Sequence, residues 1–238
     1  MSIPRIVKTW SSEAFLVQSR IPAELLERIE RCGVVAVLVV DELAHAVPLA
    51  TALMDGGIDV MELTLRTPVA LDALRAIRAE VPGMVSAVGT VLTPEQAGEA
   101  AIAGAAFGVA PGLSPRVVRA ARKVGLPFAP GVATASDLEA ALELGCREVK
   151  FFPAESTGGM SYLKSMAAPY THLGVRFVPL GGIKPDHVRA YLSSSLVLAV
   201  GGSWIAPRDV IQREDWDVIR INAARARAIV DEQRDAGG

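Results

Sequence analysis

Short runs rich in Val and Ile alternate with longer Ala- and Leu-rich runs from residue 34 almost to the end of the chain. The first short run, residues 34–40, has the unbroken β-branched character of a buried strand, and residues 42–55 read as a helix ended by Gly56 and Gly57. The pattern recurs until the chain holds eight predicted strands, each followed by a predicted helix. The strands are expected at residues 34–40, 58–65, 85–89, 107–110, 127–130, 148–152, 175–180 and 196–200.

Strands separated by helices pair in parallel, and eight such units in a chain of 238 residues are typical of a (β/α)8 barrel. We therefore predict an α/β fold, a TIM barrel at about residues 34–232 that is preceded by an extra N-terminal helix at about residues 11–31. A doubly wound open sheet is the competing architecture. It usually carries a Gly-rich turn after its first strand, and Val40-Asp41-Glu42 offers none. No linker or low-complexity tract divides the chain, so a single domain of residues 1–238 is expected.

The composition narrows the class of partner. Hydrophobic residues make up 51% of the chain and aromatic residues 5%, so aliphatic side chains must fill the core. A net charge of -2, with both signs interspersed, gives no bulk attraction for nucleic acid or an anionic membrane, and a small molecule is the expected partner. The two cysteines, Cys32 and Cys146, lack metal-like spacing and suit a reducing cytoplasm. We expect neither a secretory signal nor a membrane span.

A lysine interrupts the sixth predicted strand. Alternation puts Lys150 on one face with Phe152, while Val149 and Phe151 point to the other. If the first face is enclosed, the ammonium is poorly solvated, and the neutral amine that can form a Schiff base is favoured. A lysine on an edge strand whose amine reaches water is the alternative interpretation, and this strand alone leaves both open.

Polar and apolar residues alternate at the end of the second predicted strand, where Glu62, Thr64 and Arg66 share one face. Because outward faces in this fold pack on helices, we expect these side chains to point into the barrel, near the strand ends that carry chemistry. An internal Glu–Arg ion pair is the structural alternative. Thr90 follows the third strand and would place its hydroxyl at the same rim, although a lone threonine there is also a common cap.

Glycine pairs follow the last two predicted strands: Gly181-Gly182, and Gly201-Gly202 with Ser203 after it. Bare backbone N–H groups at these positions of a barrel can close on phosphate, and the Ser203 hydroxyl can add a donor. The sequence therefore predicts a phosphorylated ligand.

The three histidines, His45, His172 and His187, share no spacing of the metal-ligand type and are interpreted as surface or helix residues. No cluster of acidic or imidazole side chains calls for a metal or other cofactor, so the amine of Lys150 is the better candidate catalyst.

Six motifs follow one another between about Val34 and Trp204: Glu62-Leu63-Thr64-Leu65-Arg66-Thr67, Gly89-Thr90-Val91-Leu92, Ala110-Pro111-Gly112, Lys150-Phe151-Phe152-Pro153-Ala154-Glu155, Gly181-Gly182-Ile183 and Gly201-Gly202-Ser203-Trp204. Together they resemble the 2-keto-3-deoxy-6-phosphogluconate (KDPG) aldolase / 4-hydroxy-2-oxoglutarate (KHG) aldolase family. The lysine motif with the glutamate motif upstream is the most specific part of the resemblance.

The resemblance implies a class I aldolase, an aldehyde-lyase without metal or cofactor, that cleaves KDPG to pyruvate and glyceraldehyde 3-phosphate, or KHG to pyruvate and glyoxylate. It implies that Lys150 is the Schiff-base lysine and Glu62 the general acid/base. Arg66 and Thr90 would hold the pyruvyl carboxylate. The two Gly-Gly pairs and Ser203 would bind phosphate, and the chain would form a homotrimer.

Two positions depart from the family pattern. Leu180 stands where the phosphogluconate enzymes usually carry a threonine associated with reading the C4 hydroxyl configuration. Because leucine cannot make that hydrogen bond, the galactonate epimer, 2-keto-3-deoxy-6-phosphogalactonate, is an alternative substrate. Ala87-Val88 replaces the usual Gly-Ala before Gly89, and added bulk beside the carboxylate site is expected.

Two further functions remain open from the sequence. A phosphate-binding barrel isomerase or epimerase would use Lys150 as an electrostatic group and Glu62 as a proton shuttle, without a covalent imine. A catalytically silent barrel would bind a phosphorylated metabolite tightly and not turn it over.

Overall fold

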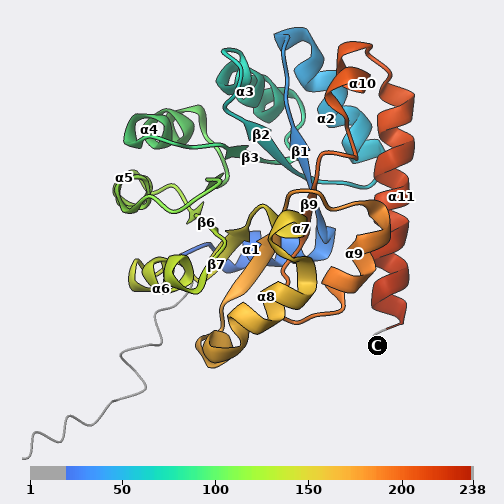
Figure 1. Cartoon of the computed structure of the whole chain (residues 1–238). Helices are drawn as coiled ribbons and strands as arrows, with labels where there is room; N and C mark the ends of the chain where they lie inside the picture. Colours follow the sequence, from blue (N-terminus) through green and yellow to red (C-terminus); the bar gives the residue numbers. More distant parts are fainter. Residues whose placement is uncertain (1–19, 237–238) are drawn as a thin grey trace, which may run out of the picture.

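The computed structural model of the chain describes residues 20–236 (Figure 1). Its strands and helices follow the predicted order, except that residues 128–129 and 131–132 form two successive strands with no helix between them. The strands are β1 (Val34–Leu38), β2 (Val60–Thr64), β3 (Val85–Gly89), β4 (Gly108–Val109), β5 (Phe128–Ala129), β6 (Gly131–Val132), β7 (Glu148–Phe151), β8 (Arg176–Pro179) and β9 (Val200–Gly202). They pair in parallel in the orders β5-β4-β3-β2-β1-β9 and β6-β7-β8. These pairings confirm the α/β class and the parallel sheet.

Helices lie around the outside of the curled sheet, as Figure 1 shows. They are α1 (Ala23–Cys32), α2 (Ala46–Asp55), α3 (Ala70–Glu80), α4 (Pro94–Ala103), α5 (Pro115–Lys123), α6 (Ala135–Glu143), α7 (Ala154–Thr157), α8 (Gly159–Ala167), α9 (Pro185–Leu192), α10 (Arg208–Gln212) and α11 (Trp216–Asp235), with 3-10 turns η2 (Leu43–His45) and η3 (Ala168–Leu173). The long helix α11 packs against α2 and α9. Aliphatic side chains fill the space between sheet and helices, as the low aromatic content requires.

The edges of the two sheet segments lie next to each other. Only Pro130 separates β5 from β6, and its carbonyl accepts a hydrogen bond of 2.9 Å from the Lys150 N–H. On the other side, Phe177 of β8 forms a parallel bridge with Val197, whose segment runs on into β9.

A helix precedes the first strand. Residues 11–31 were expected to be helical, and α1 covers the second half of that range, whereas residues 11–19 lie outside the described part of the chain. The helix ends at Gly33, whose φ of 70° is the left-handed conformation that glycine adopts most easily. Ile29 is 3% exposed and lines a small internal cavity together with Val35, Glu62 and Lys150 from the strands.

Candidate active site

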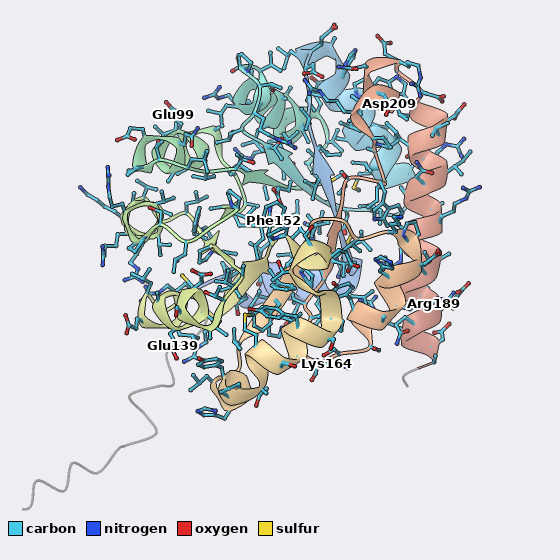
Figure 2. The ribbon with its side chains drawn as sticks, in the orientation of Figure 1. Glu99, Glu139, Phe152, Lys164, Arg189 and Asp209 are labelled. Atoms are coloured by element: carbon cyan, nitrogen blue, oxygen red, sulfur yellow. The ribbon has the colours of Figure 1, made fainter. Side chains whose placement is uncertain are left out.

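A cavity of about 350 Å³ opens at the C-terminal ends of the strands. Figure 2 places Phe152, one of its lining residues, in the middle of the molecule, whereas Glu99, Glu139, Lys164, Arg189 and Asp209 lie at the periphery. The structure brings every residue singled out from the sequence as a candidate site residue to this one cavity. They are Glu62, Arg66, Thr90, Lys150, Leu180, Gly181, Gly182, Gly201, Gly202 and Ser203.

The Lys150 amine and the Glu62 carboxylate meet inside the fold. Nζ of Lys150, on β7, donates to Oε1 of Glu62, on β2, over 3.1 Å, and lies 3.4 Å from Oε2. The two side chains are 7% and 3% exposed, so each charge depends on the other for compensation. The same Nζ lies 5.4 Å from the ring centroid of Phe152. The amine is therefore enclosed, as the first of the two interpretations requires.

Gly89 leaves the space that the Glu62 carboxylate occupies. A β-carbon added at Gly89 would lie 1.8 Å from Oε1 of Glu62 and 2.5 Å from its Cδ, closer than any real contact. Gly89 pairs with Thr64 in the β2–β3 register, so its missing side chain would project into the same interior. The sequence offered the Gly89-Thr90 motif but not this reason for its glycine.

Thr64 ties the Arg66 side chain to the sheet. Its hydroxyl donates to the Leu38 carbonyl over 2.9 Å and accepts a hydrogen bond of 3.1 Å from Nε of Arg66. Arg66 is exposed at the cavity mouth. The terminal N–H groups of its guanidinium have the planar geometry that suits two hydrogen bonds to a carboxylate. Glu62 does not form the alternative internal ion pair with Arg66, because its carboxylate pairs with Lys150.

Thr90 has an unusual backbone. Its φ of 59° lies in the left-handed region, which a β-branched residue rarely adopts. The residue follows β3 directly and lines the cavity. A strained residue of this kind at a strand end is a common mark of a functional site.

The two glycine pairs shape the opposite wall. Gly181 and Gly182 have φ of 98° and 79°, which allow the backbone to turn tightly there. A β-carbon at Gly201 would lie 2.3 Å from Cγ of Leu180, so the leucine, 5% exposed, packs where that side chain would be. Ser203 is exposed beside them.

Other lining residues were not assigned a place in the site from the sequence: Val37, Pro111, Phe152 and Ile183. The alternation of β7 already put Phe152 on the face of Lys150, and Val37 is the β1 partner of Glu62 in the parallel register. In contrast, the bulk expected from Ala87 and Val88 does not reach the cavity, because neither residue lines it.

The histidines lie away from the Lys150–Glu62 pair. His45 is 4% exposed in η2, stacked edge-on against Trp216 and 3.4 Å from the Glu214 carboxylate, so it is a buried residue of a 3-10 turn and not a surface one. Among residues 20–236, no group of three or more His, Cys, Asp or Glu side chains could hold a metal. No helix in that range is long and apolar enough to cross a membrane.

The chain is similar to known aldolases in sequence. The family model described as "KDPG and KHG aldolase" matches residues 25–222. The KHG/KDPG aldolase of Escherichia coli K12 is 47% identical over 193 residues, which cover 81% of this chain and 90% of the relative.

Two solved structures resemble this fold closely. The KDPG aldolase of Legionella pneumophila, with pyruvate captured as a covalent carbinolamine intermediate, superposes with a TM-score of 0.80 at 39% identity, over 84% of this chain and 96% of that one. The KDPG aldolase of Zymomonas mobilis ZM4, solved with 3-phosphoglycerate, superposes with a TM-score of 0.79 at 42% identity. The superposition covers 86% of this chain and 95% of that one. The chain, with its enclosed lysine and glutamate at the strand ends, belongs to the KDPG and KHG aldolase family.

Proposed function

We propose that this chain is a class I aldolase that cleaves KDPG to pyruvate and glyceraldehyde 3-phosphate, and also KHG to pyruvate and glyoxylate. One observation carries the proposal: the buried Lys150 amine lies 3.1 Å from the buried Glu62 carboxylate, in the cavity that opens at the C-terminal strand ends. A nucleophilic amine beside a proton-transferring carboxylate is what Schiff-base cleavage of a 2-keto acid needs. The carbinolamine captured in the Legionella relative supports the same chemistry.

Lys150 supplies the electron sink. Its amine attacks the C2 carbonyl, and loss of water from the carbinolamine leaves a protonated imine. When the C3–C4 bond breaks, the bonding electrons move toward the iminium nitrogen and form an enamine. Protonation of C3 of the enamine restores the protonated imine, and water then hydrolyses it, which releases pyruvate and returns the free amine.

Glu62 moves the protons. Its carboxylate takes the proton of the C4 hydroxyl as the C3–C4 bond breaks and an aldehyde leaves. It then returns a proton to C3 of the enamine. One carboxylate serves both steps, directly or through a water molecule, because the two carbons are neighbours in the substrate.

Arg66 and Thr90 hold the carboxylate of the keto acid in this proposal. The guanidinium fork matches a carboxylate, and the Thr64 hydroxyl on Nε limits where that fork points. At the other end of the substrate, the backbone of the two glycine pairs and the Ser203 hydroxyl bind the phosphate. The 3-phosphoglycerate in the Zymomonas relative is consistent with a phosphorylated ligand.

The galactonate epimer remains a second candidate substrate because of Leu180. This side chain lines the cavity and packs against Gly201, and it offers no hydrogen bond to a C4 hydroxyl. Measuring kcat/KM for both epimers decides between them. If kcat/KM is more than about tenfold higher for the galactonate epimer, that epimer and not KDPG is the main substrate.

We also propose that the two sheet segments form one closed eight-stranded barrel in a single domain. The support is the junction at Pro130 and the bridge between Phe177 and Val197, together with one cluster of buried apolar side chains from Ile29 to Val230.

We further propose that the chain forms a homotrimer in the cytoplasm. The exposed apolar side chains of Leu92 and Ile102, at α4, favour a subunit interface there. The free thiols of Cys32 and Cys146 support a reducing compartment such as the cytoplasm. Light scattering after gel filtration would test the assembly.

The decisive experiment is intact mass after incubation with pyruvate and borohydride, followed by peptide mapping. A single reduced pyruvyl adduct on Lys150, absent from Lys150→Ala, is the expected result. Lys164, an exposed lysine on α8, provides the control, and Lys164→Ala should be labelled like the native chain. A folded protein without an adduct would contradict the Schiff-base mechanism and favour the isomerase or the binding barrel.

A further inference from the structure

Glu155 lies behind the glycine turn at residues 181–182. It belongs to the lysine motif but does not line the cavity, and the chemistry above gives it no part. Its backbone N–H donates to the Gly181 carbonyl over 3.0 Å, next to the 2.7 Å bond from the Ala154 N–H to the Leu180 carbonyl. A β-carbon on Gly182 would lie 2.9 Å from Cβ of Glu155. The stem of Glu155 is therefore packed directly against the turn.

Two side chains of α9 hold the Glu155 carboxylate. The Tyr191 hydroxyl donates to Oε1 over 2.6 Å, and Nδ1 of His187 lies 3.3 Å from Oε2. Tyr191 is only 2% exposed, so its hydroxyl depends on this carboxylate as its acceptor. The Lys184 N–H approaches the same Nδ1 at 3.5 Å. We assign the Nδ1 proton to Glu155, because a carboxylate is the stronger acceptor and the Lys184 contact is at the limit of a hydrogen bond.

This arrangement clamps the turn from both sides. Helix α7, which carries Glu155, follows the lysine strand β7, and α9 begins three residues after Gly182. The carboxylate links the two helices across the turn, so the turn cannot shift without breaking a partly buried hydrogen bond from Tyr191. The two donors also contact both oxygens of a carboxylate that lies next to the turn proposed to bind phosphate.

We infer that Glu155, held by Tyr191 and His187, is a positioning residue that fixes the Gly181-Gly182 turn for the phosphate of the substrate. The inference rests on the proposed function. It assigns the network to the phosphate end alone, because none of its three side chains lines the cavity or contacts Lys150 or Glu62.

Tyr191→Phe tests the inference, because it removes one hydroxyl and keeps the ring. We expect the KM for KDPG to rise about tenfold, the loss of roughly one charge-assisted hydrogen bond. The rate at which the methyl protons of pyruvate exchange with D2O, which reports imine and enamine formation without any phosphate, should stay within about twofold. Tyr170→Phe is the matched control, since Tyr170 donates to Glu139 over 2.7 Å on the exposed surface and should alter neither value.

Glu155→Gln provides a second variant of nearly equal volume, and it carries the test if Tyr191→Phe does not fold. It too should raise the KM for KDPG with pyruvate exchange intact. An unchanged KM in both variants, or an equal loss of exchange and KDPG cleavage, would overturn the inference. The native chain separates the two proposals: if it neither exchanges pyruvate protons nor cleaves KDPG, the proposed function itself fails.

Discussion

The Lys150 and Glu62 side chains lie 88 positions apart in the sequence and 3.1 Å apart in the structure. Period-two alternation was enough to predict which face of each strand carries them, because side chains on a strand point to opposite sides in turn. It could not predict their contact, which depends on the way the sheet curls. The Tyr191–Glu155–His187 network could not be predicted either. His187 and Tyr191 lie one turn apart on α9, but Glu155 comes from α7, and no spacing in the sequence shows that the two helices meet.

Glu62→Gln should separate the two halves of the reaction. Glutamine keeps the size of the side chain but cannot take or return a proton, so KDPG cleavage should fall by about 10²–10⁴-fold. Imine formation with pyruvate, followed by borohydride trapping, should fall much less. Glu139→Gln, which alters an exposed carboxylate bonded to Tyr170, is the control and should leave both measurements unchanged. Full cleavage activity in Glu62→Gln would remove Glu62 from the proton transfers.

Gly89→Ala should displace the Glu62 carboxylate, because the new β-carbon would lie 1.8 Å from Oε1. We expect a loss of kcat of at least about tenfold, the effect of misplacing a reacting group by about an ångström. Gly98→Ala is the control: nothing lies within 4 Å of its β-carbon, and alanine favours the helix there. If both variants retain full kcat, the space at Gly89 is not needed for Glu62.

At the scale of the elements, helix caps offer a matched comparison. The Thr93 hydroxyl accepts the Gln96 N–H at the start of α4, and the Gln96 side chain accepts the Thr93 N–H in return. Ser114 holds the same position on α5 but makes no such hydrogen bond. Thr93→Ala should therefore lower the free energy of unfolding by about 1 kcal/mol in urea titrations, whereas Ser114→Ala should change it by much less. Equal losses would show that the capping box of α4 contributes nothing.

Predicted and observed strand boundaries agree for some strands and differ for others, and even the β-branched run predicted at residues 34–40 ends at Leu38. The third strand was predicted at residues 85–89, which are the bounds of β3. The last strand was predicted at residues 196–200, but β9 runs from Val200 to Gly202, because a Gly-Gly pair that reads as a turn pairs with β1 instead. The short helices α7 and α10 were not predicted, since four or five residues carry no helical period.

At the scale of the whole molecule, alternation along the sequence predicts parallel pairing, but it does not tell which strands end up at the edges. That outcome depends on hydrogen bonds between distant segments, such as the one from the Val200 N–H to the Gly33 carbonyl over 3.0 Å. Alternation therefore predicts the class of fold, whereas it does not predict how the sheet closes.

Alkaline pH should destabilise the fold through its two thiols. Burial raises the pKa of Cys32 and of Cys146 to about 11, against roughly 8.5 in an unfolded chain. A raised pKa stabilises the fold fully below about pH 8.5, and this contribution is lost as the pH rises toward 11. From pH 7 to 9.5, the free energy of unfolding should drop by on the order of 1 kcal/mol per thiol. A Cys32→Ala/Cys146→Ala double variant should show a shallower drop, and parallel pH profiles would contradict this.

Thr90 carries a cost that folding alone would not select. Its left-handed backbone, with φ of 59°, disfavours a β-branched residue by roughly 1–2 kcal/mol, whereas glycine or asparagine would accept that conformation readily. A search for heat-resistant variants of this chain would therefore be drawn to position 90, where the gain in stability would come at the expense of the carboxylate binding proposed for Thr90. The local backbone strain at Thr90 would in this respect belong to the proposed site, not to the scaffold that carries it.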